Sequence, residues 1–327
     1  MHGVPPPDFH DSGIMVNVRL PLGESRVPAP GHGCRISDAS ARHRANPMIS
    51  RRFLLFAAAM AALPATAWSR TNPAPAPEWL AGPALEALTD RFPPPPGFQR
   101  LNIAETSFGA WLRELPLRPA GESVRLYDGR VKPDQSGVAA VIDIDVGRTN
   151  LQQCADAIIR LRAEYLRAIK RTNIAFHFTS GDLYGYADWL AGRRPLVKGN
   201  LVNWMSVGAR PDTRRGFRSW LDIIFTYAGS VSLQRELTIL RDANAIEPGD
   251  VLIQPGMPGH AVLIVDVAVN AAGERRALLA QSFMPAQNIH VLNNPSGGVW
   301  YRIAGEKEIA TPDWKFAPAD LRRFPPQ

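Results

Sequence analysis

Residues 249–266 read GDVLIQ-PGMPG-HAVLIVD, which is two apolar runs joined by five residues rich in proline and glycine. This pattern is typical of a β-hairpin, so we expect antiparallel strands at 251–254 and 260–267. A histidine, His260, begins the second strand at the mouth of the hairpin, where its side chain is placed to act on a substrate. The functional interpretation depends on whether a nucleophile lies beside it.

Helical patterns come first along the chain and strand patterns come later. Apolar residues recur at helical spacing over about 150–170, which is the longest predicted helix. Further helices are expected at 182–190, 214–227 and 232–242, and further strands at 138–146, 276–284 and 300–303. This order predicts an α+β fold in which helices pack on an antiparallel sheet.

The N-terminal region has the composition of targeting and linker segments. Residues 1–47 are rich in Gly, Pro, Arg and His without periodicity, so we interpret them as a non-native or disordered extension. Residues 48–67 combine two arginines, an apolar stretch and an Ala-x-Ala motif, which is typical of a cleaved export signal of the general or the twin-arginine type. A Pro-rich linker at 68–82 leads into one α+β domain at 83–327. We therefore expect a periplasmic or secreted protein without a stable membrane span after signal cleavage.

Charge and motif content exclude several classes of function. The chain carries 37 basic and 30 acidic residues, of which seven and four lie in residues 1–67. The remainder contains no long basic run, so no nucleic-acid partner is expected. No nucleotide-binding glycine loop and no His or Cys spacing of a zinc site is found, so we expect no cofactor and no metal. The oligomeric state is left open.

Several side chains are candidates to work with His260. The helix expected at 232–242 and the strand that follows have matching lengths of about 16 and 17 Å, which brings the start of the helix close to His260. The strand at 276–284 returns Gln281 or Ser282 to the same place, in a register that the loop does not determine. A helix start that faces a histidine and a polar side chain can supply a nucleophile, a base and an orienting group.

The nucleophile is open between Cys154 and Ser232. Cys154 lies in the first turns of the longest helix, where the dipole lowers a thiol pKa, yet it also fits the apolar stripe as an inert core residue. Ser232 is a second candidate, or a simple helix cap. Ser230 and Gln254 lie beside the hairpin and are candidates for substrate binding.

Part of this region resembles NlpC-type and CHAP-type cell-wall amidases and peptidases. The resemblance covers about 225–284 and is carried by Tyr227-Ala-Gly229, Gly249-Asp-Val251 and Gly259-His260-Ala-Val-Leu-Ile-Val265. It implies a papain-like α+β core with a catalytic Cys, a His and a third polar residue. Where those families place the cysteine, after Tyr-x-Gly, this chain has Ser230 and Ser232.

A second resemblance covers nearly all of the chain after the signal. It is to an exported bacterial domain-of-unknown-function family, number 4846, and it implies no activity. The matching motifs are Tyr127-Asp-Gly129, Val141-Ile-Asp-Ile-Asp-Val-Gly147, Leu151-Gln-Gln-Cys-Ala-Asp-Ala157, Phe178-Thr-Ser-Gly181, Tyr227-Ala-Gly229 and Gln281-Ser-Phe-Met-Pro-Ala-Gln287.

Two aspartates and two further histidines are candidates of lower rank. Asp143 and Asp145 alternate with apolar residues, so both carboxylates face one side of the expected strand and are candidates for binding a ligand or a divalent cation. Salt bridges to arginines are the alternative. His177 is expected on an apolar strand, and His290 at the surface or at a strand end.

These features predict an exported cell-envelope protein of the papain-like amidase or peptidase type, acting on an amide-linked substrate such as peptidoglycan. Cys154 or Ser232 would attack the carbonyl, His260 would transfer the proton, and Gln281 would orient His260 or contact the oxyanion. The alternative is a non-catalytic relative that holds a glycan, peptide or protein partner in the same groove. A metal-dependent hydrolase built on Asp143 and Asp145 is a third possibility.

Overall fold

The computed structural model describes residues 75, 77–80 and 86–326. These all belong to the second of the two compact units of the chain, which spans Ala67–Gln327. The predicted extension at 1–47, the export signal at 48–67 and most of the linker at 68–82 lie outside the described residues. Among the described helices, none has both the length and the apolar content needed to cross a bilayer.

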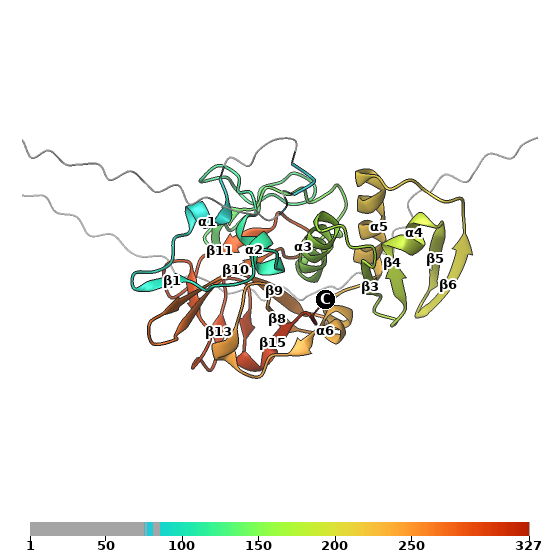
Figure 1. Cartoon of the computed structure of the whole chain (residues 1–327). Coiled ribbons are helices and arrows are strands. Elements are labelled where there is room, and N and C mark those ends of the chain that lie inside the picture. Colours follow the sequence, from blue (N-terminus) through green and yellow to red (C-terminus); the bar gives the residue numbers. More distant parts are fainter. Residues whose placement is uncertain (1–74, 76, 81–85, 327) are drawn as a thin grey trace, which may run out of the picture. The chain divides into compact units, whose positions relative to one another are not determined.

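A nine-stranded sheet forms the centre of the fold, and every strand pair in it is antiparallel (Figure 1). Its order is β2-β11-β10-β9-β8-β15-β7, with β1 beside β9 and β12 beside β10. The strands are β1 (Phe98–Arg100), β2 (Val138–Val141), β7 (Thr238–Ile239), β8 (Val251–Gln254), β9 (His260–Asn270), β10 (Arg275–Gln281), β11 (His290–Leu292), β12 (Trp300–Arg302) and β15 (Leu321–Arg323). The predicted α+β class with an antiparallel sheet is confirmed.

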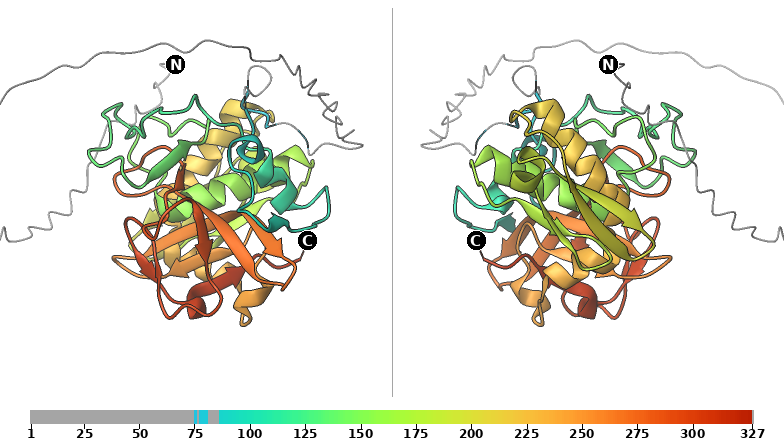
Figure 2. Two further views of the ribbon diagram at one scale, coloured as in Figure 1. Left: turned by 90° about the vertical axis from the view of Figure 1, so that its left-hand side faces the viewer. Right: turned by 90° about the vertical axis from the view of Figure 1, so that its right-hand side faces the viewer.

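The helices α2 and α3 pack against β9 and α6 packs against β8, whereas α4 and α5 lie beside the strands β3 to β6 (Figures 1 and 2). The helix predicted for residues 150–170 is α3, the longest described helix, and it is buried around nearly its whole circumference, polar residues included. The helices are α1 (Leu88–Arg91), α2 (Phe108–Arg113), α3 (Cys154–Ala168), α4 (Tyr186–Leu190), α5 (Arg214–Tyr227) and α6 (Ser230–Glu236), with 3-10 turns at Ala243–Ala245 and Pro318–Asp320.

Both faces of the sheet are buried, which explains the almost unbroken apolar sequence of β9. Ala261, Leu263 and Val265 belong to the core under the helices, whereas Val262 and Ile264 belong to a second core. The second core is closed by side chains from the C-terminal segments, among them Tyr301, Ile303, Ile309, Phe316 and Leu321.

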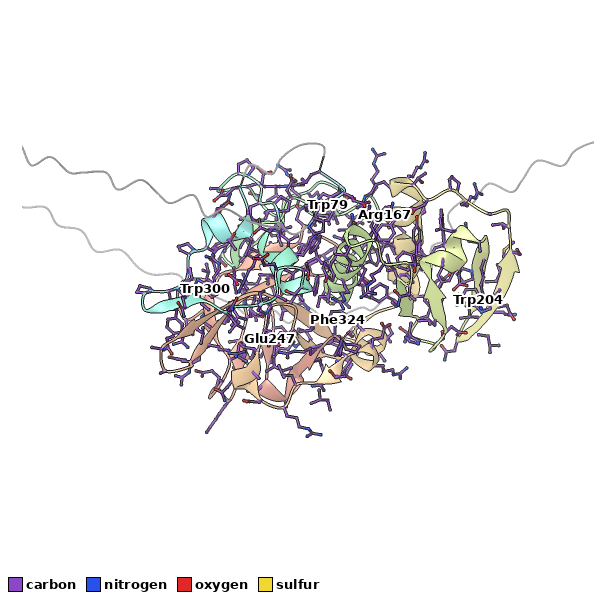
Figure 3. The ribbon with its side chains drawn as sticks, viewed as in Figure 1. Trp79, Arg167, Trp204, Glu247, Trp300 and Phe324 are labelled. Atoms are coloured by element: carbon purple, nitrogen blue, oxygen red, sulfur yellow. The ribbon has the colours of Figure 1, made fainter. Side chains whose placement is uncertain are left out.

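Three small hairpins complete the fold: β3 (Ala175–His177) with β4 (Leu183–Gly185), β5 (Arg193–Lys198) with β6 (Leu201–Ser206), and β13 (Ile309–Ala310) with β14 (Lys315–Phe316). Trp204 of β6, labelled in Figure 3, packs the β5–β6 hairpin against the β3–β4 hairpin. Its ring centroid lies 6.3 Å from that of Phe178 and 5.3 Å from that of Tyr184, and the Arg193 guanidinium carbon lies 3.8 Å from it.

The hairpin at 251–267 forms as predicted, with Gln254 opposite His260. Its loop depends on Gly259, because a Cβ there would lie 2.6 Å from the Ser230 hydroxyl and 2.7 Å from the backbone of Gly256. The lack of a side chain therefore lets the loop pack against the start of α6.

Two predicted helices are wrong in part. The helix expected at 232–242 begins at Ser230 and ends at Glu236, since Thr238–Ile239 pairs with β15 at the sheet edge. The helix expected at 182–190 begins only at Tyr186, because Leu183–Gly185 pairs with β3. In both places strand pairing prevails over local helical propensity. The strand expected at 138–146 ends at Val141, and that expected at 276–284 ends at Gln281.

Candidate functional site

His260 lies at the start of β9 with only 1% of its surface exposed. Three aromatic rings surround its imidazole. The centroid distances are 4.9 Å to Phe283, 5.5 Å to Trp314 and 5.9 Å to Phe316. The histidine is therefore covered by the segment after β10 and by the β13–β14 hairpin.

A chain of hydrogen bonds fixes the orientation of the imidazole. The Nε2 atom of Gln281 donates to the Asp313 carboxylate at 2.6 Å, which turns the amide oxygen of Gln281 toward His260. That oxygen lies 2.8 Å from Nε2 of His260, so Nε2 must carry the proton. Nδ1 is then the unprotonated nitrogen. It is buried and has no hydrogen-bond partner among the described residues.

Burial keeps the imidazole neutral. It lowers the pKa of His260 to about 4, although the hydrogen bond to Gln281 and the Asp313 carboxylate act in the opposite direction. At neutral pH the ring is therefore a base with a free lone pair on Nδ1. The Nζ atom of Lys132 lies 3.9 Å from Oδ1 of Asp313, so the carboxylate at the end of this hydrogen-bond series faces a cation.

Cys154, the first residue of α3, lies near the start of β9, where it contacts the backbone of Ala261. The pairing of β9 with β10 stops at Leu263 and Ala280, and the next residue of β10, Gln281, pairs with β11 instead. The α3 N-terminus lies close to this split: Ser282 donates from its hydroxyl to the Gln152 carbonyl at 3.1 Å, and the Ala261 N–H hydrogen-bonds the Cys154 sulfur. The residue that follows His260 thus contacts the thiol.

The thiol is protonated in this arrangement. Burial and the Asp156 carboxylate raise the pKa of Cys154 to about 11, against hydrogen bonds from the amides of Ala155, Ala261 and Cys154 itself. The thiol is not hydrogen-bonded to Nδ1 of His260, since that atom has no partner. The raised pKa of the thiol and the lowered pKa of the imidazole both favour the uncharged forms at neutral pH.

The hydroxyls of the two serine candidates, Ser230 and Ser232, form hydrogen bonds at the N-terminus of α6. Ser232 accepts from the Gly229 N–H at 3.0 Å and donates to the Gly229 carbonyl at 3.1 Å. Ser230 contacts Gly256, accepting from its N–H at 3.3 Å. Neither hydroxyl bonds His260, and the thiol of Cys154 does not bond it either.

Gln254 holds the aromatic cover in place. Its side-chain oxygen accepts from the Trp314 indole N–H at 2.9 Å, and its nitrogen donates to Asp320 at 2.7 Å and to the Lys315 carbonyl at 3.2 Å. Gln254, expected as a substrate contact, thus links β8 to the hairpin that covers His260.

Asp143 and Asp145 lie apart from this site and bind arginines. Asp143 accepts from Arg118 at 3.2 Å. Asp145 accepts from Arg160 and Arg218, each at 3.1 Å, and these cations lower its pKa although its partial burial acts to raise it. The described residues contain no group of three or more His, Cys, Asp or Glu side chains that could hold a metal ion.

Sequence reasoning missed two parts of the site. His290, expected at the surface or at a strand end, is the buried first residue of β11 opposite Gln281, and burial lowers its pKa to about 4. Asp313 was not a candidate at all. It lies 32 residues beyond Gln281 in the Thr-Pro-Asp-Trp turn between β13 and β14, and no local pattern connects it to the histidine.

The chain was compared with known proteins at the level of sequence and of structure. No curated protein and no solved structure matches it. One family model, described as a domain of unknown function (4846), matches residues 88–323, which cover most of the described chain. This range contains every residue of the site from Cys154 to Asp313. The protein belongs to the family of domain of unknown function 4846.

Proposed function

We propose that the protein is a papain-like cysteine hydrolase of the cell envelope that cleaves an amide bond in a substrate such as peptidoglycan. The observation that carries this proposal is the chain from His260 through Gln281 to Asp313, because it makes Nδ1 of His260 a proton acceptor. The order of the elements supports a papain-like core: a helix that begins with a cysteine, a strand that begins with a histidine and a neighbouring strand that ends with a polar side chain.

The chemistry follows from these positions. The Cys154 thiol gives its proton to Nδ1 of His260 while the sulfur bonds to the amide carbon. The C–N bond then breaks as His260 passes the proton to the leaving amine, which leaves a thioester on Cys154. Water, deprotonated by His260, attacks the thioester, releases the carboxylic acid and restores the thiol.

Gln281 is a positioning residue in this scheme. Its amide oxygen binds His260 and its nitrogen binds Asp313, so it orients the imidazole and is not free to bind an oxyanion. The first N–H groups of α3, which lack helical acceptors and lie beside the sulfur, are the donors that we expect to hold the oxyanion.

Substrate access requires movement of the aromatic cover. His260 is 1% exposed and Cys154 7% exposed, so an amide carbonyl cannot reach both in the resting arrangement. Trp314 is attached to Gln254 by one hydrogen bond, and we expect the β13–β14 turn that carries it to shift when substrate binds.

The test is hydrolysis of isolated peptidoglycan by the full chain, followed as the release of new amino groups. We expect Cys154→Ala and His260→Ala each to lower the rate at least about 1,000-fold. His177→Ala, which alters a histidine 44% exposed and paired with Glu236, is the matched control and should retain the rate. Unchanged turnover by Cys154→Ala would overturn the proposal.

One observation favours a second candidate, a non-catalytic binding protein. The resting thiol is protonated and makes no hydrogen bond to Nδ1 of His260. Under this alternative the full chain would sediment with peptidoglycan and release no amino groups, and His260→Ala would sediment equally well.

A further inference from the structure

A second site lies around Arg162, on the eighth residue after Cys154 along α3. The side chain is 7% exposed, yet its guanidinium makes no hydrogen bond or ion pair with any described residue. Burial lowers its pKa to about 10. Its nitrogens are not among the fully buried polar atoms that lack a partner, so the N–H groups reach open space where an acceptor can pair with them.

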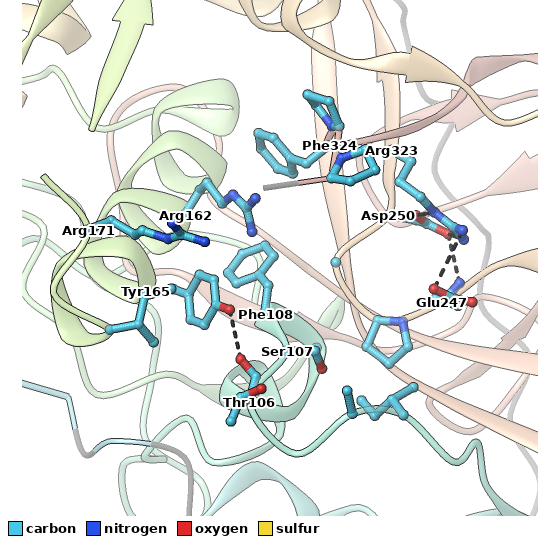
Figure 4. Close-up of a pocket in the computed structure, with 18 of the residues that line it drawn as sticks. Thr106, Ser107, Phe108, Arg162, Tyr165, Arg171, Glu247, Asp250, Arg323 and Phe324 are labelled. Atoms are coloured by element: carbon cyan, nitrogen blue, oxygen red, sulfur yellow. Dashed lines mark hydrogen bonds and ion pairs between the residues drawn. The ribbon is translucent and has the colours of Figure 1, made fainter. Parts of the chain in front are cut away.

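Aromatic rings enclose this guanidinium, as Figure 4 shows. Its central carbon lies 4.9 Å from the ring centroid of Phe108, 5.4 Å from that of Tyr165 and 4.8 Å from that of Phe324. Faces of aromatic rings stabilise a cation but supply no acceptor for its N–H groups. The donors of Arg162 are therefore oriented but unused.

The same residues line a cavity of about 610 Å³. This volume lies in the range of small-molecule sites. Apolar walls come from Phe108, Ile169, Phe324 and several prolines, and Arg171 adds a second cation that has no acidic partner among the described residues.

The charges around the cavity favour a ligand with one negative charge. On the far wall Asp250 accepts from Arg323 at 2.6 and 2.7 Å, and Glu247 lies 3.5 Å from the same arginine. These two carboxylates and one cation leave an excess negative charge there, which would repel a polyanion such as a pyrophosphate. Arg162 and Arg171 on the near wall lack such compensation.

We propose that this cavity binds a small organic carboxylate, whose charged group pairs with Arg162 and whose apolar or aromatic body packs between Phe108 and Phe324. A planar carboxylate accepts two parallel N–H groups from a guanidinium, which matches the unused donors. The adjacent rings and prolines supply the apolar surface that inorganic anions do not need.

This site is separate from the proposed reaction centre. Arg162 lies about 12 Å along the α3 axis from Cys154. The cavity adjoins Gly249 and Asp250 at the start of β8, whereas His260 pairs with Gln254 at its end. Loss of amide hydrolysis in Cys154→Ala should therefore leave carboxylate binding unchanged.

The test is isothermal titration calorimetry of the full chain with three probes: benzoate, benzyl alcohol and inorganic phosphate. We expect benzoate to bind at least about 10-fold more tightly than the neutral alcohol and than phosphate. Arg162→Met should weaken benzoate by at least about 10-fold, and the matched control Arg210→Met, an exposed arginine outside this cavity, should not.

Two results would overturn the proposal. Equal affinity for benzoate and benzyl alcohol would show a merely apolar cavity, and tighter binding of phosphate would show an inorganic anion site. Both comparisons use the unaltered protein, so they decide the matter even where Arg162→Met fails to fold.

Discussion

At the scale of single residues, Cys154 is held as a neutral thiol by burial and by Asp156. We therefore expect iodoacetamide to alkylate it in the folded protein at pH 7 about 100-fold more slowly than an unhindered thiol with a pKa near 8.5. Mass spectrometry of the Cys154 peptide, compared between folded protein and protein in urea, measures this ratio. Equal rates in the two samples would contradict a buried, protonated thiol.

The buried carboxyl group of Asp156 makes the free energy of unfolding fall as the pH rises, which is the opposite of the usual effect of an aspartate. Burial raises its pKa to about 8, while its Oδ1 atom has no hydrogen-bond partner among the described residues. The folded state thus keeps a proton that the unfolded state loses near pH 4, so this contribution to stability is complete below about pH 4 and is lost as pH rises through about 8.

Asp156→Asn tests this sign, because an asparagine can still accept from the Gln153 N–H but does not titrate. Between about pH 4 and pH 8, the wild type should lose about 1.4 kcal/mol of unfolding free energy per pH unit relative to the variant. Urea unfolding at several pH values measures the difference. Parallel pH profiles for the two proteins would refute the raised pKa.

How much of the site the sequence could predict varies from residue to residue. The sequence predicts Gln281 or Ser282 beside His260, because two adjacent antiparallel strands return to the same end of the sheet, and the structure selects Gln281. Asp313 could not be placed, because its contact depends on a two-stranded hairpin that crosses the second core. Cys154 was a candidate from its helix position, but its contact with Ala261 depends on the split between β9 and β10.

At the scale of elements, the β13–β14 hairpin controls exposure of His260 through Trp314. Trp314→Ala should admit water to the imidazole and raise its pKa from about 4 toward 6.5, because desolvation is the main cause of the depression. Titration of the His260 ring by NMR measures the change. Met257→Ala, at a residue 99% exposed in the preceding loop, is the control and should leave the pKa unaltered.

Elements with strong local patterns were predicted well, and those that depend on distant partners were not. The hairpin at 251–267 follows from its own loop and apolar runs. The strand at Thr238–Ile239 exists only because Arg322 and Arg323 of β15 pair with it. Strands that are more than 80 residues apart in sequence leave no periodic pattern in either segment, so the sequence predicts a helix through Thr238–Ile239.

At the scale of the whole molecule, the two cores share one sheet and should unfold together. Trp220 of α5 is fully buried in the first core, and Phe316 is 2% exposed in the second core. Trp220→Ala and Phe316→Ala should each lower the unfolding free energy by about 3–5 kcal/mol. We expect one transition in urea with an unchanged slope in both cases. Two separate transitions would show that the cores are independent.

The site is built from four separate segments of the chain, so it can form only after the last of them has been synthesised. Cys154, His260, Gln281 and Asp313 are added to the growing chain in that order, and the orientation of the imidazole depends on the last of them. During synthesis from the N-terminus, Cys154 is therefore present well before His260 can be oriented by Gln281 and Asp313. The proposed hydrolase therefore acquires its reactivity only after the late hairpin has docked, which delays any cleavage until folding is nearly complete.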